Sequence, residues 1–181
     1  KLPMTFPRRW EDCSAYGSYP GEGGETIYSD GIFVGYRHFD RKEANVLFPF
    51  GYGLSYTTFE YSNLSIKPDL VSDGKIDIEV SFDLKNTGRR QGAEAAQLYI
   101  RDVESSLERP VKELKGFKRV ELEPGQTKRV IFRLNGRSLA FYDTGKRDWV
   151  AEPGKFEALV GSSSRDIKLK GAFTLQKGRL L

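Results

Sequence analysis

The stretch IDIEVSFDL, residues 76–84, alternates apolar and polar residues without a break. Successive side chains of a strand point to opposite faces, so a period of two predicts a β-strand with one buried face. The apolar positions are Ile76, Ile78, Val80, Phe82 and Leu84. This segment should therefore be a core strand of a sheet.

Similar patterns continue to the end of the chain. The turn sequence NTGRRQG (86–92) precedes the apolar run AAQLYIRDV (95–103), and a Pro-Gly turn opens the alternating segment EPGQTKRVIFRLN (123–135). A second Pro-Gly turn precedes KFEALVG (155–161), and a last alternating pattern covers residues 167–175. About seven short strands separated by such turns predict a mainly β, antiparallel sandwich of the immunoglobulin or fibronectin type III kind. The Cys, Trp and Cys signature of immunoglobulin domains is absent, which favours the fibronectin-like variant.

Residues 1–55 have a different character. They are rich in Gly, Pro and aromatic residues, show no long helical period, and contain two segments that read as strands, LPMTFP (2–7) and GIFVGYR (31–37). So short a segment cannot bury its many rings within itself, so it should pack against another surface.

The segment LFPFGYGLSYTTF, residues 47–59, lies between the two parts. Its rings suit packing between structural units, and its glycines suit backbone turns that a Cβ would hinder. The segment is therefore predicted to be a joint. A platform on which a sugar stacks is the alternative.

Composition excludes several classes of function. With 38% hydrophobic residues the chain can form a core, and no apolar run is long enough to span a membrane. The net charge of +4 is dispersed along the chain, which argues against nucleic-acid binding. One cysteine, Cys13, and one histidine, His38, exclude a disulfide framework and an ordinary zinc site.

Several motifs together resemble the C-terminal part of glycoside hydrolase family 3 enzymes. They are KLPMTFP (1–7), YPGEGGETIYSDGIFVGYRHFD (19–40), FPFGYGLSYTTFEYSNL (48–64), RPVKELKGFKRVELEPGQTKRVIFRL (109–134) and WVAEPGKFEALVGSSSRDI (149–167). They occur in order over nearly the whole chain. Asp30 stands where the family pattern leads us to expect Glu, a carboxylate with a shorter reach.

The resemblance implies a domain organisation and partners. Residues 1–55 would be the end of an α/β sandwich domain with its linker, and residues 56–181 a fibronectin type III-like domain. The partners would be a TIM-like barrel and the rest of the α/β sandwich of the same enzyme, and a homo-oligomer is left open. No cofactor or metal is implied. A periplasmic or extracellular location is favoured, with the cytoplasm as the alternative.

No catalytic residue is assigned to this chain. A retaining glycosidase needs two carboxyl groups about 5 to 5.5 Å apart. In the family these would lie before Lys1, an Asp in a Ser/Thr-Asp-Trp motif of the barrel and a Glu in the α/β sandwich. The two Ser-Asp pairs of this chain, Ser29-Asp30 and Ser72-Asp73, are each followed by Gly. The carboxylates near Arg37 and His38 are expected to be solvated or ion-paired.

The loop RRWEDCSAYGSYPGEGG (8–24) holds the only candidate substrate-lining residues. They are Arg8, Arg9, Trp10, Tyr16 and Tyr19. Arginines and aromatic rings can bind a sugar by hydrogen bonding and stacking. A loop that merely packs on a neighbouring domain is the alternative.

The resemblance implies a retaining β-glycosidase, most of all a β-glucosidase that removes terminal β-linked glucose from small glucosides. This chain would support the enzyme structurally and shape its active-site entrance. The alternatives are a stand-alone carbohydrate-binding module, which needs an exposed row of rings on the sandwich, and a receptor-like interaction domain.

Overall fold

The computed structural model describes residues 1–68, 70–71 and 76–180, so Ser72 and Asp73 lie outside it. In chain order the elements are β1 (Phe6–Pro7), η1 (Trp10–Asp12), α1 (Tyr36–Arg41), β2 (Val46–Phe48), β3 (Phe59–Lys67), β4 (Leu70–Val71), β5 (Asp77–Asn86), β6 (Gly92–Asp102), β7 (Glu113–Leu122), β8 (Thr127–Asn135), α2 (Gly136–Leu139), β9 (Phe141–Asp143), β10 (Asp148–Ala151), β11 (Gly154–Ser163), β12 (Asp166–Leu175) and β13 (Arg179–Leu180). No helix among the described residues is both long and apolar enough to cross a membrane.

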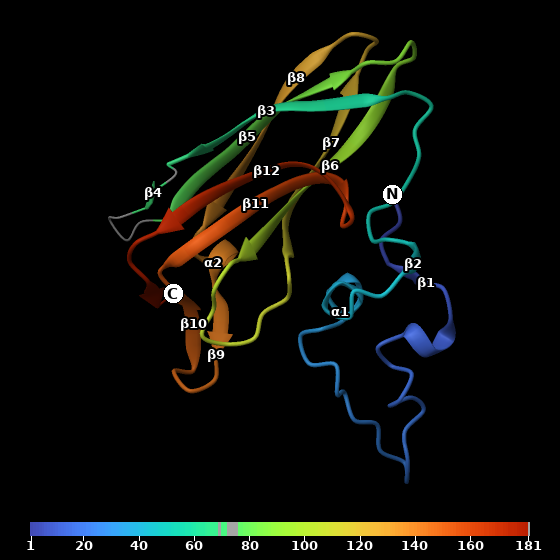
Figure 1. Cartoon of the computed structure of the whole chain (residues 1–181), viewed down its shortest axis with the longest axis vertical. Coiled ribbons are helices and arrows are strands. Elements are labelled where there is room, and N and C mark those ends of the chain that lie inside the picture. The colour runs from blue at the N-terminus through green and yellow to red at the C-terminus, as the bar shows by residue number, and fades with distance from the viewer. Residues whose placement is uncertain (69, 72–75, 181) are drawn as a thin grey trace.

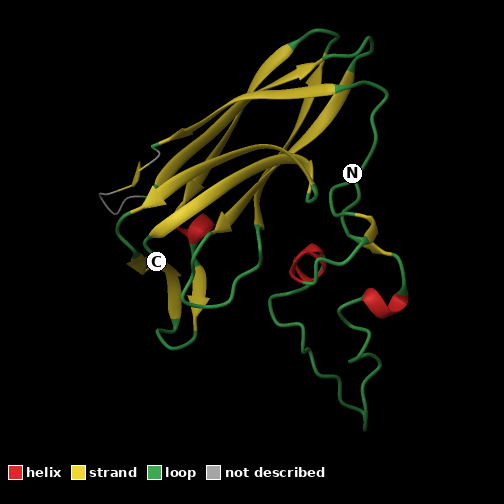
Figure 2. Ribbon diagram, in the orientation of Figure 1, coloured by secondary structure: helices red, strands yellow, loops and turns green. Residues whose placement is uncertain are grey.

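Two sheets form the sandwich, as Figures 1 and 2 show. One sheet has the strand order β4-β12-β11-β6-β7 and the other the order β3-β5-β8. The long strands pair antiparallel, as predicted, while the short strand β4 pairs parallel with β12. A small sheet of order β13-β10-β9 lies at one end. The first part of the chain, blue to cyan in Figure 1, lies to one side, where β1 pairs with β2.

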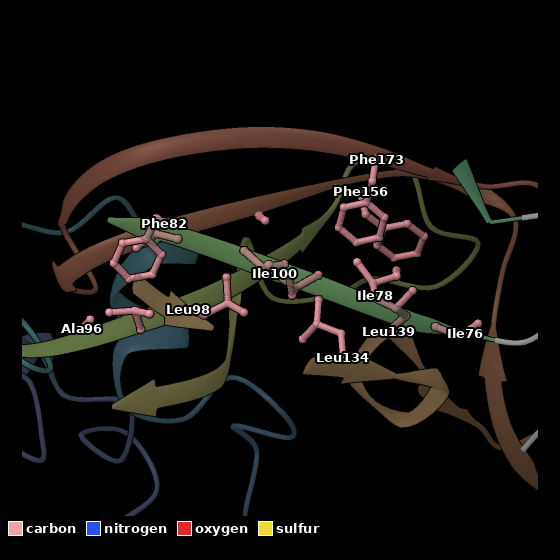
Figure 3. Close-up of a cluster of buried hydrophobic side chains, with 14 of the residues drawn as sticks. Ile76, Ile78, Phe82, Ala96, Leu98, Ile100, Leu134, Leu139, Phe156 and Phe173 are labelled. Atoms are coloured by element: carbon pink, nitrogen blue, oxygen red, sulfur yellow. The ribbon is translucent and has the colours of Figure 1, made fainter. Parts of the chain in front are cut away.

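The alternating stretch 76–84 forms β5 and its preceding residue, as predicted. Ile78, Val80, Phe82 and Leu84 are all fully buried, whereas Asp77 on the opposite face is exposed. Figure 3 shows Phe82 and Leu98 of the facing sheet in the same cluster of buried side chains. This cluster contains residues of both sheets, so the two sheets share one hydrophobic core.

Aromatic rings organise the two ends of this core. The Phe82 ring stacks on Tyr61 of β3, with centroids 5.7 Å apart, and lies 6.3 Å from Phe132 of β8. At the other end Phe156 and Phe173 face each other across the β11–β12 ladder, with centroids 5.5 Å apart. Cross-strand ring pairs of this kind add to the free energy gained by burial alone.

The predicted turn at residues 86–92 has a buried asparagine at its centre. The Asn86 amide nitrogen donates to the carbonyls of Arg90 and Leu122, and its oxygen accepts from the Thr57 hydroxyl and the Gly88 N–H. All hydrogen-bonding groups of this fully buried amide are thus used. The Thr57 contact also connects the turn to the segment before β3.

Two expectations for residues 1–55 were wrong in detail. Within residues 2–7 only Phe6–Pro7 forms a strand. Residues 31–37 form no strand: they lead through Gly35, whose φ is +57°, into helix α1. The alternating apolar residues of this segment resemble a strand, but the chain turns at Gly35 because glycine tolerates positive φ. Phe33 of this segment and Phe39 of α1 are buried, whereas Ile32 and Val34 are exposed.

Removing the Phe82 ring should strongly destabilise the chain. We expect Phe82→Ala to lower the free energy of unfolding by about 3–5 kcal/mol, because the cavity lies among fully packed side chains. The matched control is Phe117→Ala, since Phe117 on β7 is 72% exposed, and its effect should stay within about 0.5 kcal/mol. Urea denaturation followed by circular dichroism measures both, and equal losses would contradict this account of the core.

Candidate functional site

The candidate substrate-lining loop begins after β1 with the short helix η1. Trp10 and Tyr16 meet edge to face, with ring centroids 6.4 Å apart. Trp10 is 57% exposed and Tyr16 is 47% exposed, so the pair lies at the surface of this chain. The structure thus brings two of the five candidates together in an arrangement that leaves a ring face accessible.

The other three candidates do not join this pair. Arg9 donates a hydrogen bond to Asp12 at 3.0 Å, and its side chain is 72% exposed. Tyr19 is 67% exposed, and Arg8 is also exposed, with no side-chain hydrogen bond or ion pair to another described residue. Whether these groups line a subsite stays a prediction.

The loop is tied to helix α1 through the only histidine. The His38 ring nitrogen Nε2 lies 3.2 Å from the Asp12 carbonyl oxygen, and the ring packs edge to face on Phe39. Burial, together with the charges of Asp12 and Glu11, raises the pKa of the Cys13 thiol, which disfavours the reactive thiolate. These contacts tie the loop to α1.

Among the carboxylates, Asp40 is ion-paired as expected. Its two oxygens lie 2.5 Å from Lys112 Nζ and 3.3 Å from Arg165 Nε, and its side chain is only 7% exposed. Arg165 also donates to the Phe39 carbonyl at 3.0 Å. The ion pairs fix α1 against the β6–β7 loop and the β11–β12 hairpin. Asp40 therefore anchors α1 to the sandwich. Its partners Lys112 and Arg165 lie 72 and 125 residues away in the sequence, so no local pattern could predict these ion pairs.

Aromatic contacts complete the packing of residues 1–55, the first segment, against the sandwich. The Tyr36 ring lies 5.1 Å from Phe50 and 5.8 Å from Tyr99 of β6. The Tyr36 hydroxyl accepts the Leu114 N–H at 2.8 Å. The outer face of β6 is covered in this way, so residues 96–100 are buried on both faces of the strand.

At the predicted joint, Phe50 and Gly51 contact the sandwich directly. The Ser164 N–H donates to the Phe50 carbonyl at 2.9 Å, and the Gln97 amide donates to the Gly51 carbonyl at 3.4 Å. Gly51 has φ of +79°, and a Cβ added there would collide with the Gln97 amide. Packing is thus confirmed at these two residues. Leu54 and Tyr56 are instead 89% and 94% exposed.

A second cluster, which sequence reasoning missed, surrounds Glu113. Arg109 donates to Glu113 at 2.6 Å and to Asp102 at 2.9 Å, while Arg37 and Lys115 lie 3.3 Å and 3.5 Å from the Glu113 carboxylate. Desolvation opposes ionisation of Glu113, but Lys115, Arg109 and Arg37 together hold its pKa below the ordinary value. Arg109, Glu113 and Lys115 are close in sequence, but Arg37 comes from a distant part of the chain, and no pattern in the sequence signals that it joins them.

In the part of the chain that the structure describes, no group of three or more His, Cys, Asp or Glu side chains could hold a metal ion. The exposed large rings of the sandwich from β3 onward are Phe117 and Tyr142 alone among the described residues. Two rings on different strands do not form the row that a binding module for polysaccharide needs.

Comparison with known proteins identifies the class of this structure. Residues 94–164 match the family of fibronectin type III-like domains. Over 94% of its length the chain is 51% identical to thermostable beta-glucosidase B of Acetivibrio thermocellus, and over 93% it is 49% identical to beta-glucosidase BoGH3A of Bacteroides ovatus. It spans only 22% and 23% of these two relatives.

Solved structures show the same similarity. Beta-glucosidase 3B from Thermotoga neapolitana, in complex with glucose, superimposes on the whole chain with a TM-score of 0.91 at 39% identity, and the chain covers 25% of it. The GH3 beta-glucosidase of Bifidobacterium adolescentis gives 0.90 at 35% identity over 97% of this chain and 25% of its own. The resemblance is therefore confirmed: this chain is similar, over nearly its whole length, to the C-terminal region of glycoside hydrolase family 3 β-glucosidases.

Substitution at the joint should detach the first segment. We expect Gly51→Ala to lower the free energy of unfolding by more than about 2 kcal/mol, from backbone strain plus the collision with Gln97. Gly125→Ala is the matched control, because Gly125 has nearly the same φ, +76°, and open space around it, so only the strain of about 1–2 kcal/mol applies. Denaturation measures both, and hydrogen exchange of the Ser164 amide should accelerate only in the first variant. Equal effects would show that Gln97 does not hold this joint.

The Glu113 cluster should make the free energy of unfolding depend on pH. The folded-state pKa of Glu113 lies below the ordinary value of 4.5. The stabilisation that the Glu113 carboxylate provides is therefore complete above pH 4.5 and is lost as the pH falls through the folded-state pKa. Glu113→Gln should cost about 3 kcal/mol at neutral pH, and the difference from the unsubstituted chain should shrink between about pH 5 and pH 3. Urea titrations across this range measure it.

The control is Glu108→Gln, because the Glu108 side chain is 62% exposed and its ion pair with Arg41 should contribute under about 1 kcal/mol. A Glu113→Gln difference that did not change with pH would contradict the assignment.

Proposed function

We propose that this chain is the C-terminal portion of a retaining β-glucosidase that hydrolyses terminal β-linked glucose from small glucosides. The observation that carries the proposal is identity of 51% and 49% over nearly the whole chain to two β-glucosidases of which it spans less than a quarter. Residues 1–55 would be the end of the preceding α/β sandwich domain with its linker, and residues 56–181 the fibronectin type III-like domain.

In this proposal the chemistry belongs to the remainder of the enzyme. Retention requires one carboxylate that attacks the anomeric carbon and one carboxyl group that acts first as acid and then as base. In this chain Asp40 and Glu113 are held by cations, which suits anchoring and not attack on a sugar. The role of this chain is to support the enzyme and to shape its active-site entrance.

Exposed apolar side chains of the first segment support a larger partner surface. The most exposed are Ile27, Tyr28 and Leu54, with exposed fractions of 73, 88 and 89%, and Tyr56 just beyond this segment is 94% exposed. Clusters of exposed apolar groups mark surfaces that another structural unit covers. The barrel and α/β sandwich portions of the same enzyme are the occupants that fit the proposal.

The first test separates the chain from the complete enzyme. The 181-residue chain should release no nitrophenol from p-nitrophenyl β-glucoside, whereas the complete polypeptide that contains it should. Activity of the chain by itself would place the catalytic carboxylates within these residues and overturn the proposal. An inactive complete polypeptide would overturn it as well.

The second test concerns the loop that carries Trp10. If Trp10 stacks on substrate, Trp10→Ala in the complete enzyme should raise KM by about twofold to tenfold, the equivalent of one aromatic contact. The control is Ile131→Ala, a surface position on β8 that is 40% exposed, which should leave KM unchanged. A loss of thermal stability without a change in KM would assign the loop to packing between domains.

A further inference from the structure

A pocket of about 390 Å³ lies where the first segment meets the end of the sandwich. The β6–β7 loop, the region from α2 to β10, and Ile32 and Arg37 of the first segment form its walls. Figure 1 shows α2, β9 and β10 together at this end of the sandwich. The volume is in the range of sites that bind small molecules.

Four cations, Arg37, Arg109, Lys115 and Arg137, and two carboxylates, Glu108 and Glu113, line the pocket. Arg37, Arg109 and Lys115 share the carboxylates of Glu113 and Asp102. Arg109 is fully engaged, because it also donates to the Leu139 carbonyl at 2.8 Å. Lys115 has only the 3.5 Å contact to Glu113 among the described residues. Burial lowers the pKa of Lys115, and the charges of Arg109 and Arg37 lower it further. The Glu113 charge acts in the opposite direction but does not outweigh them. An anion beside Lys115 would relieve this repulsion.

Arg137 is a second available cation in the lining. Its guanidinium carbon lies 3.4 Å from the centroid of the Trp149 ring. Within the described part of the chain, Arg137 has no ion pair within 4.0 Å and donates no side-chain hydrogen bond. Stacking on the ring orients the planar fork of the guanidinium while leaving its N–H donors for a ligand.

Aromatic rings form the rest of the lining. Tyr142 and Trp149 pair across β9 and β10, with centroids 5.6 Å apart, and Phe141 lies beneath Arg109. Tyr142 is 47% exposed, so its ring offers a face to a ligand. The apolar face of a pyranose ring packs on such a surface, while its polar groups stay hydrated at the open side.

We propose that this pocket binds a saccharide that carries a carboxylate, of the glycuronic acid class. Its carboxylate lies between Lys115 and Arg137, where charge-assisted hydrogen bonds form, and its ring lies against Tyr142. The proposal of this site does not depend on the proposed glucosidase activity.

The two tryptophans of the chain give a direct measurement. In nuclear magnetic resonance spectra of the 181-residue chain, titration with D-glucuronate should shift the indole N–H signal of Trp149 saturably and leave that of Trp10 in place. D-glucose and acetate, which supply the ring and the carboxylate separately, should bind at least about tenfold more weakly. Equal binding of glucose would overturn the role of the carboxylate, and equal binding of acetate would overturn the role of the saccharide.

Two variants test the assigned cations. Arg137→Gln and Lys115→Gln should each weaken glucuronate binding by about tenfold or more. Lys170→Gln is the control, because Lys170 is ion-paired with Glu157 at 2.8 Å and is remote from the pocket lining. Arg137 is at the surface, so its substitution should leave the fold intact even if that of Lys115 does not. Unchanged binding in Arg137→Gln, or no saturable shift of the Trp149 signal, would overturn the proposal.

Discussion

Burial of strand β6 on both faces is the constraint on which the rest of this structure depends. Its inward residues Ala96, Leu98 and Ile100 enter the core of the sandwich. Its outward residues Gln97 and Tyr99 are covered by Tyr36, Phe50 and Gly51 of the first segment. If β6 were buried on one face only, Tyr99 would be exposed and the first segment would have no surface to pack against. Two-sided burial joins the two parts of the chain into one packed unit.

The contacts that hold this outer layer are polar as well as apolar. Asp40 lies between Lys112 and Arg165, and Glu113 lies among Arg37, Arg109 and Lys115. Buried ion pairs are costly to desolvate and are costlier still to break, so they favour one arrangement over its neighbours. We infer that they set the position of α1. That position in turn determines where the loop with Trp10 and Tyr16 emerges and how Arg37 completes the pocket beside Trp149.

The two proposals divide the surface of this chain by chemistry. The exposed rings of residues 1–55 leave apolar surface, which suits cover by another unit of the enzyme. The pocket at the end of the sandwich combines rings with Arg137, which stacks on Trp149 and has no ion pair with another described residue, and this suits a small anionic ligand. In both cases the sandwich serves as a rigid support, and segments outside its long strands carry the candidate binding groups.

The sequence by itself determined the core of the sandwich. Strict alternation placed Ile78, Val80, Phe82 and Leu84 on one face, because side-chain direction in a strand depends only on position along the chain. The family motifs also identified the region of the enzyme to which the chain corresponds. Only the tertiary structure decided that residues 36–41 form a helix, that Asp40 anchors it, and that Arg109, Glu113 and Trp149 share a pocket. These features arise from contacts between distant segments, to which no local period or spacing corresponds.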